Sequence, residues 1–396
     1  MERWHVATAG AVAALVGFAS SALVVIAGLR AVGASTAVAA SGLLALCVVQ
    51  GIGTILLSRR HRLPVLLAWS TPGAALLAST GHVDGGWPAA VGAFIVVGAL
   101  ILLTGLWPRL GRLIASIPAS LAQAMLAGVL LELCLAPVHG VIDHPALLAP
   151  PLLVWLALTR WRPRWAVPAA FIVAIAVVGI WLNHHGGALD GPLLPRVELT
   201  TPTLSWSALL TLALPLYVVT MASQNVPGVA VLASFGYDAP WRPAMATTGL
   251  GTMVSAFAGG HAINLAAITA ALAASPEAHP DSDKRWRVAA AAGWTFLVLA
   301  LGSAALTTIV AAAPTGVATG VAGVALLGTL AASLQAALTD ADDRIAAVVT
   351  FAVAASGITA LGIGAAFWAL LAGLVVRATT SMPRRGPIQR AARRQG

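Results

Sequence analysis

The sequence predicts an all-α membrane protein of about fourteen transmembrane segments, arranged as two inverted repeats of seven. Three observations lead to this expectation: the apolar composition, apolar runs of membrane-spanning length, and basic residues in alternate loops. Hydrophobic residues make up 59% of the 396 positions, and charged residues only 9%. Soluble domains carry about 25% charged residues, so we expect lipid to surround most of this chain.

Apolar runs of about 15–25 residues, the length that crosses a bilayer, recur along the whole chain. We place them at 8–29, 33–57, 64–79, 88–106, 117–135, 146–159, 166–182, 207–233, 243–258, 261–275, 287–312, 317–338, 345–357 and 359–377. The first run continues too far for a cleaved signal peptide, so we expect it to be a retained span.

Basic residues gather in every second loop. If the N-terminus is cytoplasmic, the loops after the even-numbered spans are cytoplasmic, and they carry Arg59, Arg60 and Arg62; Arg109 and Arg112; Arg160, Arg162 and Arg164; Arg242; and Lys284, Arg285 and Arg287. This positive-inside pattern predicts a multi-pass protein of the bacterial inner membrane with both termini in the cytoplasm. It also explains the basic charge without a nucleic-acid partner, since no soluble basic face is apparent.

Two short patterns recur at nearly the same spacing. Gly51-Ile-Gly-Thr54 is matched 198 residues later by Gly249-Leu-Gly-Thr252, and Pro118 is matched 196 residues later by Pro314. Seven spans is an odd number, so the second copy must enter the membrane from the opposite side. We therefore expect a first repeat at 1–185, an extracytoplasmic linker at 186–206, a second repeat at 207–380 and a basic cytoplasmic tail at 381–396.

Spans 3 and 10 are predicted to be broken, each with a short extended stretch followed by a half-helix. In span 3, Ser70-Thr71-Pro72 is a strong helix start, with a capping hydroxyl followed by proline in the first turn. In span 10, Gly259-Gly260 interrupts the backbone. A helix that begins in mid-membrane leaves free N–H groups and a positive dipole end there, which favours an anion such as a carboxylate.

Polar residues in these and the neighbouring spans 1 and 8 are the candidate binding residues, because polar groups within the bilayer are expensive unless they are paired or line a cavity. The predicted substrate-binding set is Ser70, Thr71, Gly73, Gln224, Asn225, Asn264, Ser20, Ser21 and Phe18. Each also has a plain structural reading as a helix cap, an interhelical hydrogen bond or core packing. His261 and Glu132 are the candidates for proton coupling.

Three segments carry a resemblance to a known family. They are Val16-Gly-Phe-Ala-Ser-Ser21, Ala68-Trp-Ser-Thr-Pro-Gly-Ala-Ala-Leu-Leu77 and Thr220-Met-Ala-Ser-Gln-Asn-Val-Pro-Gly-Val-Ala-Val-Leu232. On these runs the chain resembles the benzoate/proton symporters, or BenE-type carriers, over roughly residues 10–377. The resemblance implies the seven-plus-seven fold shared with uracil and sulfate carriers, divided into a core and a gate domain.

The resemblance also implies uptake of benzoate or a similar aromatic carboxylate together with a proton. Nucleobase carriers of this fold use carboxylates on spans 8 and 10, whereas this chain has none there, as suits an anionic substrate. A carrier for another anion or a nucleobase, a channel, a membrane enzyme and a scaffold are the alternatives. The sequence contains no phosphate-binding loop, metal-ligand spacing or catalytic triad, so we expect no enzyme, metal or cofactor, and a homodimer is a candidate assembly.

Overall fold

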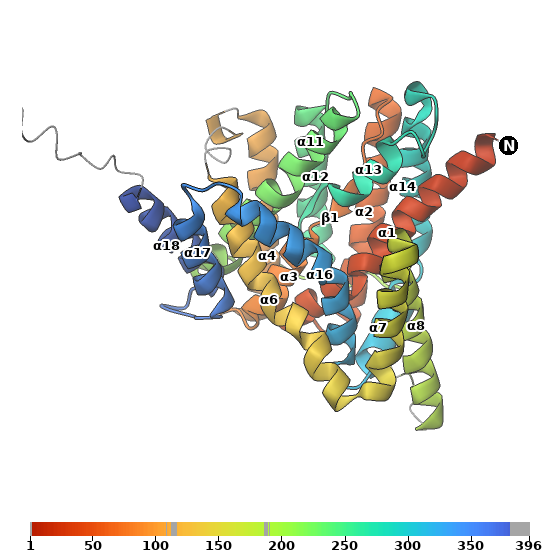
Figure 1. Ribbon diagram of the computed structural model, residues 1–396, viewed down its shortest axis with the longest axis horizontal. Helices are drawn as coiled ribbons and strands as arrows, with labels where there is room; N and C mark the ends of the chain where they lie inside the picture. Colours follow the sequence, from red (N-terminus) through yellow and green to blue (C-terminus); the bar gives the residue numbers. More distant parts are fainter. Residues whose placement is uncertain (1, 108, 112–116, 186–188, 190, 381–396) are drawn as a thin grey trace, which may run out of the picture.

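The computed structural model describes residues 2–107, 109–111, 117–185, 189 and 191–380, and it is almost entirely helical (Figure 1). The predicted basic tail at 381–396 and Arg112 lie outside the described residues. The longer helices are α1 (Glu2–Ala31), α2 (Thr36–His61), α4 (Gly86–Leu106), α6 (Ala119–Asp143), α7 (Pro145–Trp161), α8 (Pro163–His184), α12 (Trp241–Phe257), α14 (Trp286–Ala300), α16 (Val317–Leu338), α17 (Arg344–Ala355) and α18 (Ala365–Thr380).

Shorter elements join them. These are the strands β1 (Leu67–Trp69) and β2 (Ile263–Leu265); the helices α3 (Thr71–Thr80), α9 (Trp206–Ala208), α10 (Leu214–Thr220), α11 (Val226–Ser234), α13 (Ile268–Ala274) and α15 (Ser303–Ala312); the π-helical turns η1 (Leu209–Ala213) and η2 (Met221–Asn225); and the 3₁₀ turn η3 (Ser282–Lys284). Every predicted apolar run coincides with one helix or with a few consecutive elements.

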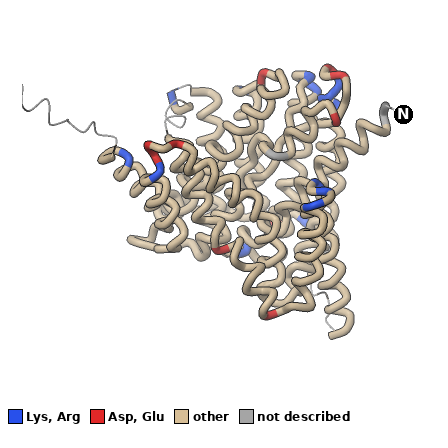
Figure 2. Tube along the Cα trace, viewed as in Figure 1, with Lys and Arg blue, Asp and Glu red and all other residues tan. Residues whose placement is uncertain are grey.

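Seven helices among the described residues are long and apolar enough to cross a membrane. They are Trp4–Ala31, Thr36–His61, Gly86–Leu106, Ala119–Asp143, Pro163–His184, Trp206–Ser234 and Val317–Leu338. An eighth is the pair Ser282–Ala300 and Ser303–Ala312, which is bent by 54°. Most charged residues lie at helix ends and in loops (Figure 2). The prediction of an all-helical, multi-pass membrane protein is therefore confirmed.

The two strands come from distant parts of the chain and pair in the middle of the molecule. They run antiparallel, with Ala68 opposite Asn264. Each strand is held by a threonine of the helix that precedes it: Thr54 accepts a hydrogen bond from the Leu67 N–H, and Thr252 accepts one from the Ile263 N–H, both at 2.9 Å. The two Gly-x-Gly-Thr motifs thus support the two strands in the same way.

Glycines in those motifs allow two helix pairs to approach closely. A Cβ at Gly51 of α2 would lie 2.8 Å from the Gly293 carbonyl of α14, and a Cβ at Gly249 of α12 would lie 2.7 Å from the Gly98 carbonyl of α4. Only a residue without a side chain permits this backbone contact, as is common between membrane helices. The close crossings fix α2 and α12 beside the paired strands.

The helix from Trp206 to Ser234 contains two π turns, and each has a proline just after it. Proline lacks an N–H, so Pro215 and Pro227 withdraw the hydrogen bonds that Thr211 and Ser223 would otherwise accept. Those acceptors lie within η1 and η2. Such turns are frequent at functional sites, and η2 contains the predicted binding residues Gln224 and Asn225.

Helices α6, α16, α17 and α18 pack together at one side of the molecule (Figure 1). Asp343, at the start of α17, accepts hydrogen bonds from Ser120 at 2.8 Å and from Arg377 at 2.7 Å. Burial alone would raise the pKa of the Asp343 carboxyl, but these two bonds and the Arg377 charge hold it below its ordinary value. The ionised carboxylate therefore ties α6, α17 and α18 at this end.

Candidate functional site

A cavity of about 440 Å³ lies beside the paired strands. Its size falls within the range of small-molecule sites, and its walls are mainly apolar with a few polar groups, as in most such sites. The lining residues are Val16, Gly17, Ser20, Ser21, Gln50, Ala68, Trp69, Thr71, Pro72, Pro163, Arg164, Val167, Pro168, Gln224, Ala266, Ala267, Thr269, Leu272, Phe296, Ala325, Gly328 and Thr329.

One end of the cavity is the start of α3. The Ser70 hydroxyl caps this helix by accepting a hydrogen bond from the Gly73 N–H at 3.1 Å, and it accepts another from the Thr220 hydroxyl at 2.9 Å. Thr71 and Pro72, the first residues of α3, line the cavity. Pro72 has no N–H, and the Gly73 N–H is taken by the cap. The features of this end that suit an anion are therefore the Thr71 N–H, the Thr71 hydroxyl and the positive end of the helix dipole.

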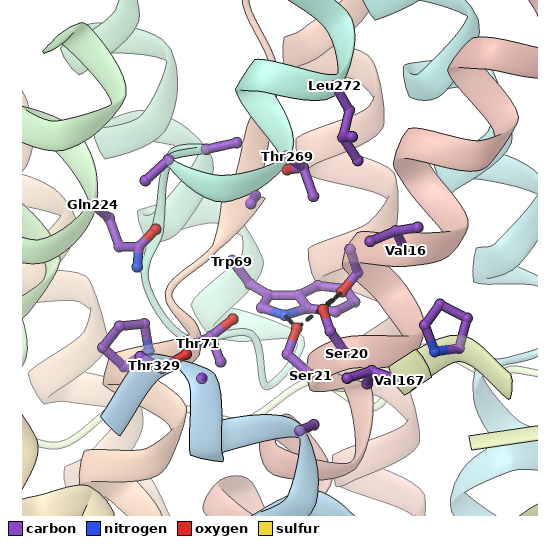
Figure 3. A pocket seen from close by; sticks show the side chains of 18 of the residues that line it. Val16, Ser20, Ser21, Trp69, Thr71, Val167, Gln224, Thr269, Leu272 and Thr329 are labelled. Atoms are coloured by element: carbon purple, nitrogen blue, oxygen red, sulfur yellow. Dashed lines mark hydrogen bonds between the residues drawn. The ribbon is translucent and has the colours of Figure 1, made fainter. Parts of the chain in front are cut away.

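Aromatic rings form a wall of the cavity. Trp69 and Phe296 line it with their ring centroids 6.4 Å apart, and Phe18 packs against Trp69 at 5.8 Å, all in edge-to-face arrangements. The Trp69 indole N–H donates to the Ser21 hydroxyl at 2.8 Å, which fixes the ring (Figure 3). A flat apolar molecule would meet a rigid aromatic surface here.

Buried polar side chains around the strands divide into two groups. Asn225 is bonded: its side-chain oxygen accepts from the Leu265 N–H at 2.9 Å and its nitrogen contacts the Met221 sulfur at 3.2 Å. In contrast, the side-chain nitrogens and oxygens of Gln50, His261 and Asn264 have no hydrogen-bond partner of normal geometry among the described residues. Such groups are uncommon in folded proteins, and each requires an explanation.

Arg164, at the start of α8, is the one charged side chain among the described residues that line the cavity. It forms an ion pair with Glu277, which follows α13, and both side chains are more than half exposed. The mouth of the cavity therefore lies at this end. It carries the positive charge of Arg164, which is paired with the carboxylate of Glu277.

The predicted binding residues occupy two kinds of position. Ser20, Ser21, Thr71 and Gln224 line the cavity, and Figure 3 shows Thr71 and Gln224 together on one side of the Trp69 ring. The others lie behind this surface: Ser70 caps α3, Asn225 braces β2, Phe18 supports Trp69, Gly73 gives α3 room beside Leu216, and Asn264 is buried in β2.

The two proton-coupling candidates lie apart from the cavity lining. His261 is fully buried just before β2. Glu132 lines a separate cavity of about 30 Å³ between α3, α6 and the segment that joins α17 to α18.

The sequence reasoning did not single out Gln50, Thr269, Trp69, Phe296 or Arg164 as site residues. Gln50 and Thr269 could have been found by the criterion applied to Gln224, since each is a polar residue within an apolar run. Arg164 was assigned to a cytoplasmic loop, and nothing in the sequence places that loop beside a cavity.

Comparison with known proteins identifies the family. The family model described as "Benzoate membrane transport protein" matches residues 3–379. The chain belongs to this family. It is 30% identical over 367 residues to a relative named "Benzoate membrane transport protein" from Acinetobacter baylyi, with 93% of each chain covered. It is 44% identical over 370 residues to "Inner membrane protein YdcO" from Escherichia coli, covering 92% of this chain and 93% of the relative.

Solved structures with the same fold are anion transporters. The transmembrane domain of the cyanobacterial bicarbonate transporter BicA matches with a TM-score of 0.61 at 15% identity, over 95% of this chain and 96% of that one. SLC26A9 matches with a TM-score of 0.60 at 15% identity, over 93% of this chain and 64% of that one. The family and these neighbours are membrane transporters, so this protein is a transporter and not an enzyme.

Proposed function

We propose that this protein takes up benzoate or a similar small aromatic carboxylate, together with a proton, by alternating access across the inner membrane. The observation that carries the proposal is the cavity itself, which has a helix N-terminus at one end and an aromatic wall beside it. An aromatic acid is a flat apolar ring with one anionic group, so the two features match its two parts.

The carboxylate docks at the start of α3. Its oxygens accept hydrogen bonds from the Thr71 N–H and the Thr71 hydroxyl, and Gln224 is a further donor on the same side (Figure 3). Charge at a helix N-terminus is stabilised by about 0.3–1 kcal/mol at exposed sites, and by more where water is excluded. The second half-helix, α13, has only seven residues and contributes less.

The ring of the acid packs against Trp69 and Phe296, with Val16 and Leu272 completing the apolar surface. Aromatic pairs contribute about 0.5–1.5 kcal/mol beyond the burial of their area. This wall favours an aromatic acid over a small hydrated anion such as bicarbonate, which has no apolar face to bury.

Alternating access requires two parts of the protein that move against each other. We infer fourteen membrane segments in a seven-plus-seven inverted repeat, with a core of α1–α4 and α9–α14 and a gate of α6–α8 and α16–α18. The matched threonine–strand bonds and glycine crossings of the two halves support this division. Arg164 and Glu277 lie on the predicted cytoplasmic side, so the mouth between them opens inward.

A proton crosses with the anion and reduces the charge that enters the membrane. His261 is the first candidate to carry it, because the ring is buried next to the strand pair and neither nitrogen has a hydrogen-bond partner of normal geometry among the described residues. Glu132 is the second, because it lies in a small cavity between the core helix α3 and the gate helix α6. A group between two moving parts is suited to link protonation to movement.

Uptake of radiolabelled benzoate into proteoliposomes tests the proposal. We expect saturable uptake that an inward-directed proton gradient stimulates and that unlabelled aromatic acids compete away. Uptake that ignores the gradient would refute coupling, and competition by bicarbonate, sulfate or uracil in place of aromatic acids would assign a different substrate to this fold.

A further inference from the structure

Gln50 has no structural role that explains its presence. The residue lies in the middle of α2, is 1% exposed, and belongs to the inner wall of the cavity. Neither its amide oxygen nor its amide nitrogen has a hydrogen-bond partner among the described residues. A buried amide without partners destabilises a protein, and a methionine of the same length would fill this space without that penalty. A bound molecule that completes these hydrogen bonds accounts for the glutamine.

The neighbours of Gln50 place it at the aromatic end of the cavity. The next residue, Gly51, packs against Gly293 and Leu297 of α14, and Phe296 of that same helix lines the cavity. Residues four apart share a helix face, and Thr54, one turn along α2, bonds to β1 just before Trp69. Gln50 therefore lies on the side of Trp69 and Phe296.

The start of α3 lies on another side of the cavity. Its residue Gly73 packs against Leu216 of α10. In Figure 3, Thr71 and Gln224 lie on the same side of the Trp69 ring, away from the other end of the ring. An aromatic acid that is anchored by its carboxylate at Thr71 directs its ring toward Trp69 and Phe296. A substituent on that ring then approaches α2.

We propose that Gln50 hydrogen-bonds a polar substituent on the ring of the bound acid, so that the site prefers hydroxy- or amino-benzoates to benzoate itself. The inference rests on the proposed function, since it assumes an aromatic acid anchored by its carboxylate. The amide oxygen accepts from a ring O–H or N–H, and the amide N–H₂ donates to a ring oxygen. Because no side chain or backbone group among the described residues hydrogen-bonds the amide, no such bond has to break when the side chain turns toward the substrate.

The discrimination expected of such a group is large. A site built to hydrogen-bond a substrate hydroxyl disfavours the analogue without it, because its own buried polar group is then left unpaired. We expect at least one hydroxybenzoate or aminobenzoate isomer to bind about tenfold more tightly than benzoate, a difference of about 1.4 kcal/mol.

Calorimetric titration of the full-length protein with benzoate and with the hydroxybenzoate and aminobenzoate isomers provides the test. Gln50→Met should weaken binding of the substituted acid about tenfold more than binding of benzoate, so that the preference is lost. Gln123→Met on α6, which makes the same substitution away from the cavity lining, should keep the preference. The thermal stability of ligand-free Gln50→Met should equal or exceed that of the wild type, because an unpaired amide has been removed.

Several outcomes would overturn the inference. Equal affinity of the wild type for benzoate and for all substituted acids would do so. A Gln50→Met variant that is less stable and binds benzoate and the substituted acids equally weakly would also do so, because it would indicate a structural role for Gln50. If Gln50→Met does not fold, Gln50→Asn withdraws the amide by one methylene group and should weaken only the substituted acids. If the wild type binds benzoate and the substituted acids equally well, only the role of Gln50 is contradicted. If no aromatic acid binds the folded wild type, the proposed function is contradicted as well.

Discussion

The starts of α3 and α13, called here the first and the second break, share a scaffold but differ in how their polar groups are satisfied. Each follows a strand that is held by a threonine of the preceding helix, at 2.9 Å in both cases. The first break is completed by the Ser70 cap and leads into a ten-residue helix. The second has no side-chain cap, leads into a seven-residue helix, and leaves the side chains of His261 and Asn264 without hydrogen bonds of normal geometry among the described residues.

From this difference we infer that the two breaks have different roles at the site. The first break is held by the hydrogen bonds of Ser70, which fix the start of α3 in place, as a binding platform requires. The second holds polar groups that are free to form bonds when substrate, proton or a new conformation supplies a partner. The predictions below test that contrast.

The largest effect is expected from Gly73→Val. A Cβ at Gly73 would lie 2.4 Å from Leu216 and 2.8 Å from the Ser70 hydroxyl, so the larger side chain pushes α3 away from its cap. Overpacking costs about 1–3 kcal/mol, and we expect at least a ~10-fold loss of benzoate uptake in proteoliposomes. Gly179→Val on α8 is the matched control, since a Cβ there meets nothing within 4 Å. Normal uptake by Gly73→Val would mean that the start of α3 is not part of the site.

Ser70→Ala should have the next largest effect. It removes the helix cap, which costs about 1 kcal/mol, and leaves the buried Thr220 hydroxyl without its partner. We expect a lower melting temperature and a roughly tenfold weaker affinity for benzoate, as measured by calorimetry. Ser234→Ala, which changes an exposed serine at the end of α11, serves as the control. Unchanged stability and affinity would show that the Ser70 cap does not fix the start of α3.

Asn264→Leu tests the other break and should change stability in the opposite direction. The side chain is fully buried and unbonded, so its replacement by an apolar group of similar size should raise the ligand-free unfolding free energy by about 1 kcal/mol. Uptake should still fall, because the carrier loses a group that bonds during the cycle. Thermal unfolding and uptake are measured on the same preparation. A loss of stability as large as that of Ser70→Ala would remove the contrast between the two breaks.

The smallest effect is expected at the mouth of the cavity. Arg164→Gln breaks an exposed ion pair with Glu277, and such pairs contribute only about 0–1 kcal/mol, so stability should hardly change. Binding of the anion from the cytoplasmic side should slow by roughly twofold at low salt, with the difference vanishing at high salt because ions screen exposed charges. Glu277→Gln frees Arg164 and should not slow binding. A salt-independent effect of Arg164→Gln would point to a direct contact deeper in the site.

Local signals in the sequence were enough to predict the first break. The hydroxyl–proline pair of Ser70-Thr71-Pro72 marks a helix start wherever it occurs, and the structure begins α3 at Thr71. The apolar runs similarly predict the helices, because their length is set by the bilayer. The glycine pair at Gly259-Gly260 predicts an interruption, and in the structure α12 ends at Phe257 and α13 begins at Ile268.

Side-chain direction could not be predicted in the same way. In a helix that is apolar on all sides, the pattern does not reveal which face lines a cavity. Gln50 lines the cavity but is not among the predicted site residues, and the predicted Phe18 packs against Trp69. The bracing of β2 by Asn225 depends on a contact between residues forty positions apart. No local pattern contains that information.

A crystal structure with bound 4-bromobenzoate tests the central claim most directly, because the bromine marks the end of the ring opposite the carboxylate. The account predicts carboxylate density beside Thr71, at the start of α3, and an anomalous bromine peak on the side of Trp69 and Phe296. A bromine peak at the start of α3, or an acid bound outside this cavity, would contradict it.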